Sequence, residues 1–285
     1  MYTLKKDSES VYLTTKDFLV TGESFALLYD EEKEMLLTSP QPNEADLPIY
    51  YKSEAYISHT DANKGIVATL YQWVKKYSLS KKLRLITGLN KGAGTLLDIG
   101  AGTGDFLKLA QDYSWMVSGV EVNKSARSLS EKKGIVLAET LKSVSGQQFD
   151  VVTLWHVLEH LPNLERTLTE LEALVKPGGV LIIAVPNFKS FDASYYKEYW
   201  AAYDTPRHLW HFSRKAMRGL FSDSMKLIKS KPMIFDSFYV SLLSEKYKTG
   251  NAFSLRALLV GLWSNLSALG TKENSSLIYC FKKAK

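Results

Sequence analysis

The chain has 285 residues, of which 45% are hydrophobic, so it can bury the core of one large domain or of a domain with an appendage. Its 36 basic and 30 acidic residues give a formal net charge of +6, but the two signs are interspersed and the basic clusters are short. This pattern indicates a solvated surface and argues against a nucleic-acid partner.

The start of the sequence, its apolar runs and its cysteine content bear on location. The first ten residues lack the apolar core of a signal peptide. The longest strictly apolar run covers residues 180–185, far below the roughly 18 residues of a membrane span. The one cysteine, Cys280, permits no internal disulfide and suits a reducing compartment. We therefore expect a cytoplasmic protein without a membrane span.

Residues 1–60 are expected to form an N-terminal β-hairpin extension. Two prolines stiffen a connector over residues 39–43. The aromatic residues between 50 and 59 then either cover a ligand site or pack as part of an N-terminal lid. Short apolar runs predict strands at residues 17–21, 25–29 and 35–38, with a turn at 30–33.

A helix is expected over residues 61–80, with Thr60 or Asp61 as its N-cap. Its apolar residues recur near helical spacing, so one face should pack on a sheet. These residues are Ile66, Leu70, Trp73, Val74 and Tyr77.

The stretch from Thr95 to Leu107 reads as an apolar strand, a turn with three glycines and a helix. Gly100, Gly102 and Gly104 lack a Cβ atom, so the backbone of the turn can adopt otherwise costly dihedrals and touch a ligand directly. This arrangement is typical of a site for an adenosine-containing cofactor.

The spacing of the glycines separates two classes of cofactor. Dinucleotide folds use G-x-G-x-x-G with a pyrophosphate on the helix N-terminus. Here the glycines run G-x-G-x-G, and the third place is taken by Asp105, where an acid would repel a pyrophosphate. Asp98, just before the first glycine, suits a cationic group such as the amino group of S-adenosylmethionine. The alternative is a tight turn in an α/β protein that binds no ligand.

Further strands follow at helix-sized intervals, which is the alternation that builds a parallel sheet. Residues 117–122 form an expected strand that contains Glu121, 17 residues beyond Gly104, where a carboxylate could accept both ribose hydroxyls. The other expected strands are residues 135–138, residues 149–155 and the apolar run that follows the Pro-Gly-Gly turn and ends at Val185.

The motifs D-I-G-A-G-T-G, V-E-V, F-D-V-V-T-L-W-H-V-L-E-H and V-K-P-G-G-x-L occur in that order. In this the chain resembles the class I S-adenosylmethionine-dependent methyltransferases, especially small-molecule and glycan-cluster enzymes related to the ubiquinone-biosynthesis O-methyltransferases. The resemblance covers about residues 61–235 and the last strand. It implies an α/β fold with a doubly wound, mostly parallel seven-stranded sheet, the last strand antiparallel, in a methyltransferase domain at 61–285. Relatives often carry zinc-binding cysteines in the N-terminal hairpin, and this chain has none there.

The resemblance also implies the S-adenosylmethionine site. The three glycines would approach the methionine part, Asp98 would hold its ammonium directly or through water, and Glu121 would bind the ribose. Residues 139–141 would lie near the adenine. The full expected set is Asp98, Gly100, Ala101, Gly102, Gly104, Glu121, Val122, Glu139, Thr140, Leu154 and Trp155.

Two segments could serve the methyl acceptor, and the first is residues 154–160, directly after a parallel strand. His156 is the expected general base. Glu159 and His160 are expected to orient the loop by hydrogen bonds. The H-x-x-E-H match to a metalloprotease pattern is interpreted as accidental, so no metal is expected, with a divalent ion at Glu159 and His160 as the alternative.

The second segment, residues 200–213, is dense in aromatic and ionisable groups on an expected loop. Arg207 could clamp a substrate carboxylate or phosphate, with His211 and Trp200 beside the substrate. Asp204 and His208 are further candidates for taking a proton, as is His211. The alternative is an Arg-Asp-His network that only fixes the loop.

The last part of the chain contains a helical insertion over about residues 239–270. Leucines and Trp263 predict a strongly apolar helix at 252–269, which could line the substrate pocket, form a homodimer contact or pack in the core. The other expected elements are a helix at 214–222 and strands at 227–235 and 276–281.

The resulting hypothesis is methyl transfer from S-adenosylmethionine to an oxygen or nitrogen of a small molecule or sugar. Positioning of donor and acceptor can supply roughly 7–11 kcal/mol of such a barrier. A non-catalytic cofactor-binding scaffold is the main alternative, an RNA methyltransferase is less favoured, and a nicotinamide oxidoreductase is disfavoured by Asp105. Pyrimidine C5 methylation would need a cysteine near the cofactor, whereas Cys280 lies in the expected final strand.

Overall fold

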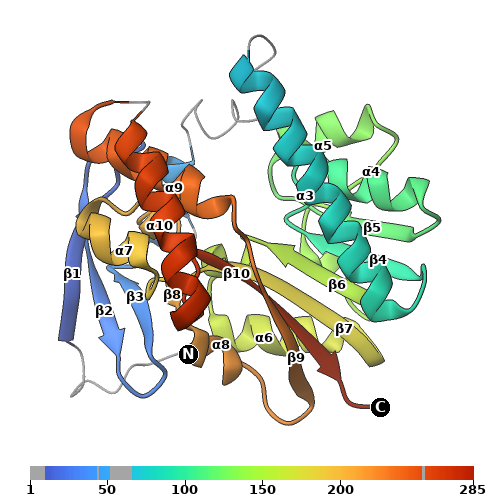
Figure 1. Ribbon diagram of the computed structural model, residues 1–285. Coiled ribbons are helices and arrows are strands. Elements are labelled where there is room, and N and C mark those ends of the chain that lie inside the picture. The colour runs from blue at the N-terminus through green and yellow to red at the C-terminus, as the bar shows by residue number, and fades with distance from the viewer. Residues whose placement is uncertain (1–9, 44, 52–65, 252–253) are drawn as a thin grey trace.

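The central sheet of the computed structural model consists of β4 (Thr95–Ile99), β5 (Met116–Val120), β6 (Phe149–Trp155), β7 (Val175–Pro186), β9 (Met225–Pro232) and β10 (Ser276–Lys283) (Figure 1). The structure describes residues 10–43, 45–51, 66–251 and 254–285. The strand order is β5-β4-β6-β7-β10-β9. The first four strands in this order run parallel, and β10 is antiparallel to both of its neighbours. The expected doubly wound, mostly parallel fold with an antiparallel last strand is therefore confirmed.

Within the described residues this sheet has six strands, not the expected seven. Residues 135–138, expected as a strand, form a single bridge between Ala138 and Val120. Ala138 donates to the Gly119 carbonyl and accepts from the Glu121 amide, each at 2.9 Å. The segment is held by the burial of its side chains at Ile135 and Leu137 instead of by a longer ladder.

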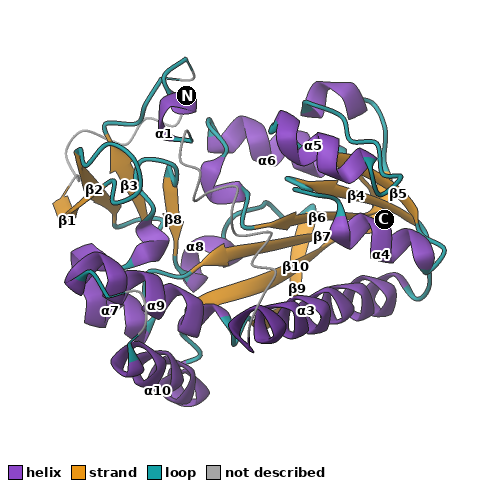
Figure 2. Cartoon of the chain, turned by 90° about the horizontal axis from the view of Figure 1, so that it is seen from above, coloured by secondary structure: helices purple, strands orange, loops and turns teal. Residues whose placement is uncertain are grey.

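Helices cover both faces of the sheet, as Figure 2 shows. Along β7, alternate side chains point to opposite faces, as the pleat of a strand requires. Val180 and Ile182 join a core cluster with α3 and α4, whereas Leu181 and Ile183 join a cluster with α6 and α8. These flanking helices are α3 (Ile66–Asn90), α4 (Asp105–Asp112), α5 (Lys124–Glu131), α6 (Leu164–Ala173) and α8 (Arg214–Arg218).

A second, antiparallel sheet joins the N-terminal extension to a late segment of the chain. It consists of β1 (Ser10–Lys16), β2 (Ser24–Asp30), β3 (Met35–Ser39) and β8 (Trp210–Phe212), in that order. The strands expected at 25–29 and 35–38 are confirmed, but the one expected at 17–21 is wrong. Those residues form a turn because the Asp17 carboxylate accepts hydrogen bonds from the amides of Leu19, Val20 and Thr21.

The C-terminal half adds a helical layer over this second sheet (Figure 1). It comprises α7 (Phe191–Tyr196), α9 (Asp236–Thr249) and α10 (Leu255–Thr271). The apolar helix expected at 252–269 is confirmed as α10, whereas α9 was not expected as a separate helix. The helix expected at 214–222 ends earlier, at Arg218, and the strand expected at 227–235 ends at Pro232.

The helix expected over 61–80 is α3, which continues ten residues further, to Asn90. Its proposed N-cap at Thr60 or Asp61, and residues 52–59 of the aromatic segment, lie outside the described residues. A short helix, α1 (Leu47–Tyr50), precedes that gap. The domain boundary at residue 60 stays a prediction.

None of the helices in the described ranges is long and apolar enough to cross a bilayer.

Candidate functional site

The three-glycine turn between β4 and α4 has one open position. Gly100, Gly102 and Gly104 have φ angles of +69°, +54° and +75°, in the left-handed region that disfavours other residues. A Cβ atom at Gly100 would collide with Val157, and one at Gly104 with Ser130. At Gly102 no described atom lies within 4 Å of that position. Gly102 therefore has the open space that contact between backbone and ligand requires.

Glu121 is fixed beside this turn at the carboxyl edge of the sheet. Its Oε2 atom accepts a hydrogen bond from the Gly102 amide and its Oε1 atom accepts one from the Asn123 amide, each at 2.8 Å. A carboxylate offers about four acceptor positions, so lone pairs remain for a ligand's hydroxyl groups. The carboxylate thus lies beside Gly102, and its contact with a ribose stays a prediction.

The two segments expected near the adenine, one after Val120 and one after Ala138, lie side by side at the carboxyl edge of the sheet. The bridge between Val120 and Ala138 brings them together. Val122 is 76% exposed. Glu139 and Thr140 are also exposed, and Glu139 pairs with Arg127 at 3.4 Å. The exposed side chains of Val122 and Thr140 could contact a planar ring, whereas that of Glu139 is engaged by Arg127.

Asp98 is a buried carboxyl group in β4, beneath the turn. It is 2% exposed, and Thr153 Oγ1 donates to its Oδ1 atom at 2.6 Å. Burial raises the pKa of Asp98 to about 7, against the opposing effects of the Thr153 hydrogen bond and of the positive charge on Lys82. A further cation nearby would favour its ionised form.

Lys82, whose charge acts on this carboxyl group, was not predicted, because the helix that carries it was expected to end at residue 80. Its Nζ atom lies 4.3 Å from the centre of the Trp155 ring. The indole N–H of Trp155 is buried without a hydrogen-bond partner among the described residues. The expected contacts of Leu154 and Ala101 are limited to backbone atoms, because both side chains are buried in the core.

Asp105 does not face a ligand as an unpaired charge. It lies 2.8 Å from Lys75 Nζ and 2.7 Å from Lys133 Nζ, which outweigh the effect of burial and lower its pKa. Because both lysines offset its charge, Asp105 would repel a pyrophosphate less than the sequence alone indicates. The distinction from dinucleotide folds therefore depends on the glycine spacing.

His156, the expected base, links the end of β6 to the start of α9. Its Nε2 atom lies 3.0 Å from Asp236 Oδ2, and its Nδ1 atom lies 3.4 Å from Glu159 Oε1. Burial alone would lower the pKa of His156, but these two carboxylates outweigh it and raise the pKa to about 10. An imidazolium has no lone pair to accept a proton. This charge state fits a structural cation better than a general base.

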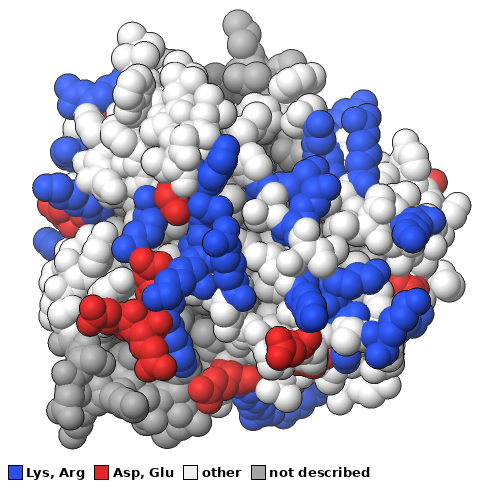
Figure 3. Space-filling model, turned by 60° about the horizontal axis from the view of Figure 1, so that its bottom comes forward, with Lys and Arg blue, Asp and Glu red and all other residues white. Residues whose placement is uncertain are grey.

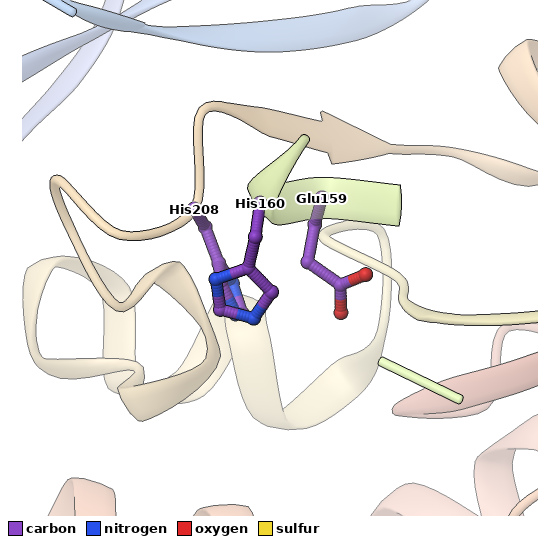
Figure 4. Close-up of side chains that lie close together, drawn as sticks. All are labelled: Glu159, His160 and His208. Atoms are coloured by element: carbon purple, nitrogen blue, oxygen red, sulfur yellow. The ribbon is translucent and has the colours of Figure 1, made fainter. Parts of the chain in front are cut away.

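Glu159 and His160, on η2 (Leu158–His160), converge with His208 (Figure 4). One possible ligand atom from each residue lies within 4.8 Å of the others. Glu159 is fully buried; its Oε1 atom is paired with His156 at 3.4 Å, and its Oε2 atom has no hydrogen-bond partner among the described residues. Two imidazoles and a carboxylate are a donor set that a divalent ion can occupy.

Second contacts orient the two rings of this cluster. His160 Nδ1 lies 3.1 Å from both the Tyr51 hydroxyl and the Arg207 carbonyl. His208 Nδ1 lies 2.9 Å from the Ala202 carbonyl. The Nδ1 atoms are thus engaged, and the Nε2 atoms are the remaining ligand positions, that of His208 lying 4.0 Å from Asp204 Oδ2. No local sequence signal pairs Tyr51 or His208 with residues 159–160.

Arg207 does not have the predicted role of a substrate clamp. Its guanidinium is 1% exposed and lies 2.9 Å from Asp17 and 2.7 Å from Asp204. A third group, the Tyr50 carbonyl, accepts from Nη1 at 3.0 Å. Arg207 therefore ties the 200–213 loop to the N-terminal extension, and the same pairing engages the Asp204 carboxylate.

The two other predicted substrate contacts are also internal. Trp200 is 2% exposed and donates to Asp192 Oδ2 at 2.7 Å. His211 is 4% exposed, and its Nε2 atom lies 3.1 Å from Thr38 Oγ1. The structure therefore favours the alternative interpretation, a network that fixes this loop.

Residues 71–224 match a family model described as a methyltransferase domain. A ubiquinone biosynthesis O-methyltransferase from Paraburkholderia phymatum is 27% identical over 165 residues, which are 50% of this chain and 70% of that protein. One from Coxiella burnetii is 28% identical over 107 residues, 34% of this chain and 46% of that protein. The chain thus spans about half the length of the Coxiella relative.

A crystal structure described as a proposed sarcosine dimethylglycine methyltransferase from Galdieria sulphuraria has a TM-score of 0.50 to this chain. The two are 13% identical, and the match covers 74% of this chain and 85% of that one. This likeness concerns the fold alone.

Proposed function

Because the chain belongs to the family of methyltransferase domains, we propose that it transfers the methyl group of S-adenosylmethionine to an oxygen or nitrogen of a small molecule or sugar. The observation that carries this proposal is the open backbone at Gly102, whose amide is bonded to Glu121. The Gly102 and Asn123 amides hold the Glu121 carboxylate beside that open space, where its remaining lone pairs can accept hydrogen bonds from a ligand's hydroxyl groups.

The described residues fit the cofactor in four respects. Gly102 leaves room where a side chain would otherwise stand, and Glu121 retains acceptor positions beside it. Asp98 is a buried carboxyl group that a cation would stabilise, and Trp155 has an N–H without a partner among the described residues. When bound, S-adenosylmethionine supplies a methyl group activated by its sulfonium charge.

We place the acceptor next to residues 156–160. Val157 packs against Gly100, so this segment begins beside the glycine turn. The buried carboxylate of Glu159, whose Oε2 atom has no hydrogen-bond or ion-pair partner among the described residues, favours a divalent ion held by Glu159, His160 and His208, which revises the expectation of no metal. Such an ion would lower the pKa of an acceptor hydroxyl and so replace the base role first given to His156.

Two measurements test the function. Titration calorimetry with S-adenosylhomocysteine should show one site per chain. Loss of S-adenosylmethionine in the presence of pooled hydroxyl- and amine-bearing small molecules and sugars should show turnover. Binding without turnover on any pool would favour the scaffold alternative, and binding of NADH without S-adenosylhomocysteine would refute the methyltransferase assignment.

The compartment is also a proposal. We place the protein in the cytoplasm, because its one cysteine, Cys280, is a buried free thiol that needs no oxidising environment. Cell fractionation with antibody detection tests this location.

A further inference from the structure

Helix α10 buries its small residues and exposes its large apolar ones, the reverse of what a helix of a globular domain usually does. The residues it buries, mainly toward α9 and α7, are small: Ala257, Val260, Gly261, Ser264 and Ala268. The large apolar side chains point outward, each between 46% and 71% exposed. They are Leu255, Leu259, Leu262, Trp263, Leu266 and Leu269. A helix packed only for stability would bury its leucines, so this exposed face indicates an interaction surface.

The face continues onto α7. Phe191, Tyr195 and Trp263 border a shallow groove of about 320 Å³ together with leucines of α10. The Phe191 and Trp263 rings are 6.5 Å apart, and Lys248 Nζ lies 5.6 Å from the centre of the Tyr195 ring. Aromatic rings and a lysine at the border of an apolar face are typical of a membrane–water interface.

Basic residues extend this border along α8. Arg214 donates to the Thr271 carbonyl at the end of α10, at 3.3 Å, which places α8 beside that end. Lys215 and Arg218 are exposed on α8. Glu273, nearby, is paired with Arg214 at 3.4 Å. Figure 3, which brings the lower side of the molecule forward, shows that lysine and arginine predominate on that side.

We propose that α10 and the exposed basic residues of α8 dock the protein on an anionic lipid surface. The apolar side chains enter the boundary between headgroups and acyl chains, and Lys215 and Arg218 bind lipid phosphates. A second copy is the alternative occupant, which the flotation and light-scattering measurements distinguish.

Vesicle flotation with the full chain tests the surface. Vesicles of phosphatidylcholine with phosphatidylglycerol should carry the protein, and vesicles of phosphatidylcholine alone should carry about tenfold less. The double variant Leu259→Ser/Leu266→Ser should lose binding about tenfold or more. Its matched control, Tyr113→Ser/Val136→Ser, changes two exposed apolar residues elsewhere and should bind as the wild type does.

A charge pair completes the test. Lys215→Glu/Arg218→Glu should lose about tenfold or more in binding to the anionic vesicles, whereas Lys124→Glu/Lys132→Glu, with the same change in net charge, should lose less. Equal loss of vesicle binding in both variants would show that binding depends on net charge alone and would overturn the proposal. So would absence of flotation together with a dimer, seen by light scattering, that Leu259→Ser/Leu266→Ser converts to a monomer.

Discussion

Alanine at Gly102 should separate cofactor binding from folding. The position has a φ of +54° and no described atom within 4 Å of the added Cβ, so the folded protein has room for a methyl group there. If the open space belongs to the cofactor, that methyl group will lie between backbone and ligand. Gly134 is the matched control, with a φ of +78°, the same absence of described neighbours, and a position outside the glycine turn.

The expected loss of stability follows from the backbone conformation, and the expected loss of affinity follows from crowding of the contact between Gly102 and the cofactor. A left-handed conformation costs a residue with a Cβ atom roughly 1–2 kcal/mol, and the loss of unfolded-state entropy offsets about half of this. Both Gly102→Ala and Gly134→Ala should therefore lose about 1 kcal/mol, or about 2 °C in Tm. Crowding a packed contact by one methyl group costs roughly 1–3 kcal/mol, which for Gly102→Ala is about 5- to 150-fold in Kd.

Differential scanning fluorimetry and titration calorimetry with S-adenosylhomocysteine measure the two effects. We expect equal losses of Tm and a loss of affinity confined to Gly102→Ala. Wild-type affinity in Gly102→Ala, with the expected Tm, would refute the assignment of this space to the cofactor. Gly104→Ala should lose more stability than either, because the new side chain meets Ser130.

Three further predictions concern buried charges. Burial raises the pKa of Asp98 to about 7, so its carboxylate becomes protonated as the pH falls below 7. Calorimetry should therefore show about tenfold weaker S-adenosylhomocysteine binding at pH 6 than at pH 8. Asp98→Asn should remove most of this pH dependence. Arg207→Ala should cost about 3–5 kcal/mol of unfolding free energy, because it leaves the Asp17 carboxylate buried and uncompensated. Arg207→Lys should lower Tm without raising KM. A raised KM at unchanged Tm would instead show that Arg207 binds the substrate. Elemental analysis after dialysis against zinc or manganese should find one ion per chain, lost in Glu159→Gln and kept in Glu139→Gln; an ion-free wild type would contradict the metal proposal.

The parts of this molecule that the sequence predicts well are those specified by neighbouring residues. The glycine turn is one example, because its conformation depends on residues 100–104 themselves and its strand and helix lie directly on either side. The failures have a common physical cause. Residues 17–21 look like a strand, yet the side chain of Asp17 satisfies their amides locally, and its charge is matched by Arg207, 190 residues away. No local pattern reveals such a partner.

The same distinction separates the two sides of the proposed active site. On the cofactor side, Gly102 and Glu121 directly follow β4 and β5, which are consecutive strands and neighbours in one sheet. On the acceptor side, His160 contacts Tyr51 of the N-terminal extension, and His156 contacts Asp236 of α9. Both contacts join residues 80 or more positions apart, so the acceptor side exists only once the extension and the C-terminal helices have packed. Acceptor choice should therefore depend on these added segments, and exchanging them between related chains should alter the acceptor while leaving the affinity for S-adenosylhomocysteine unchanged.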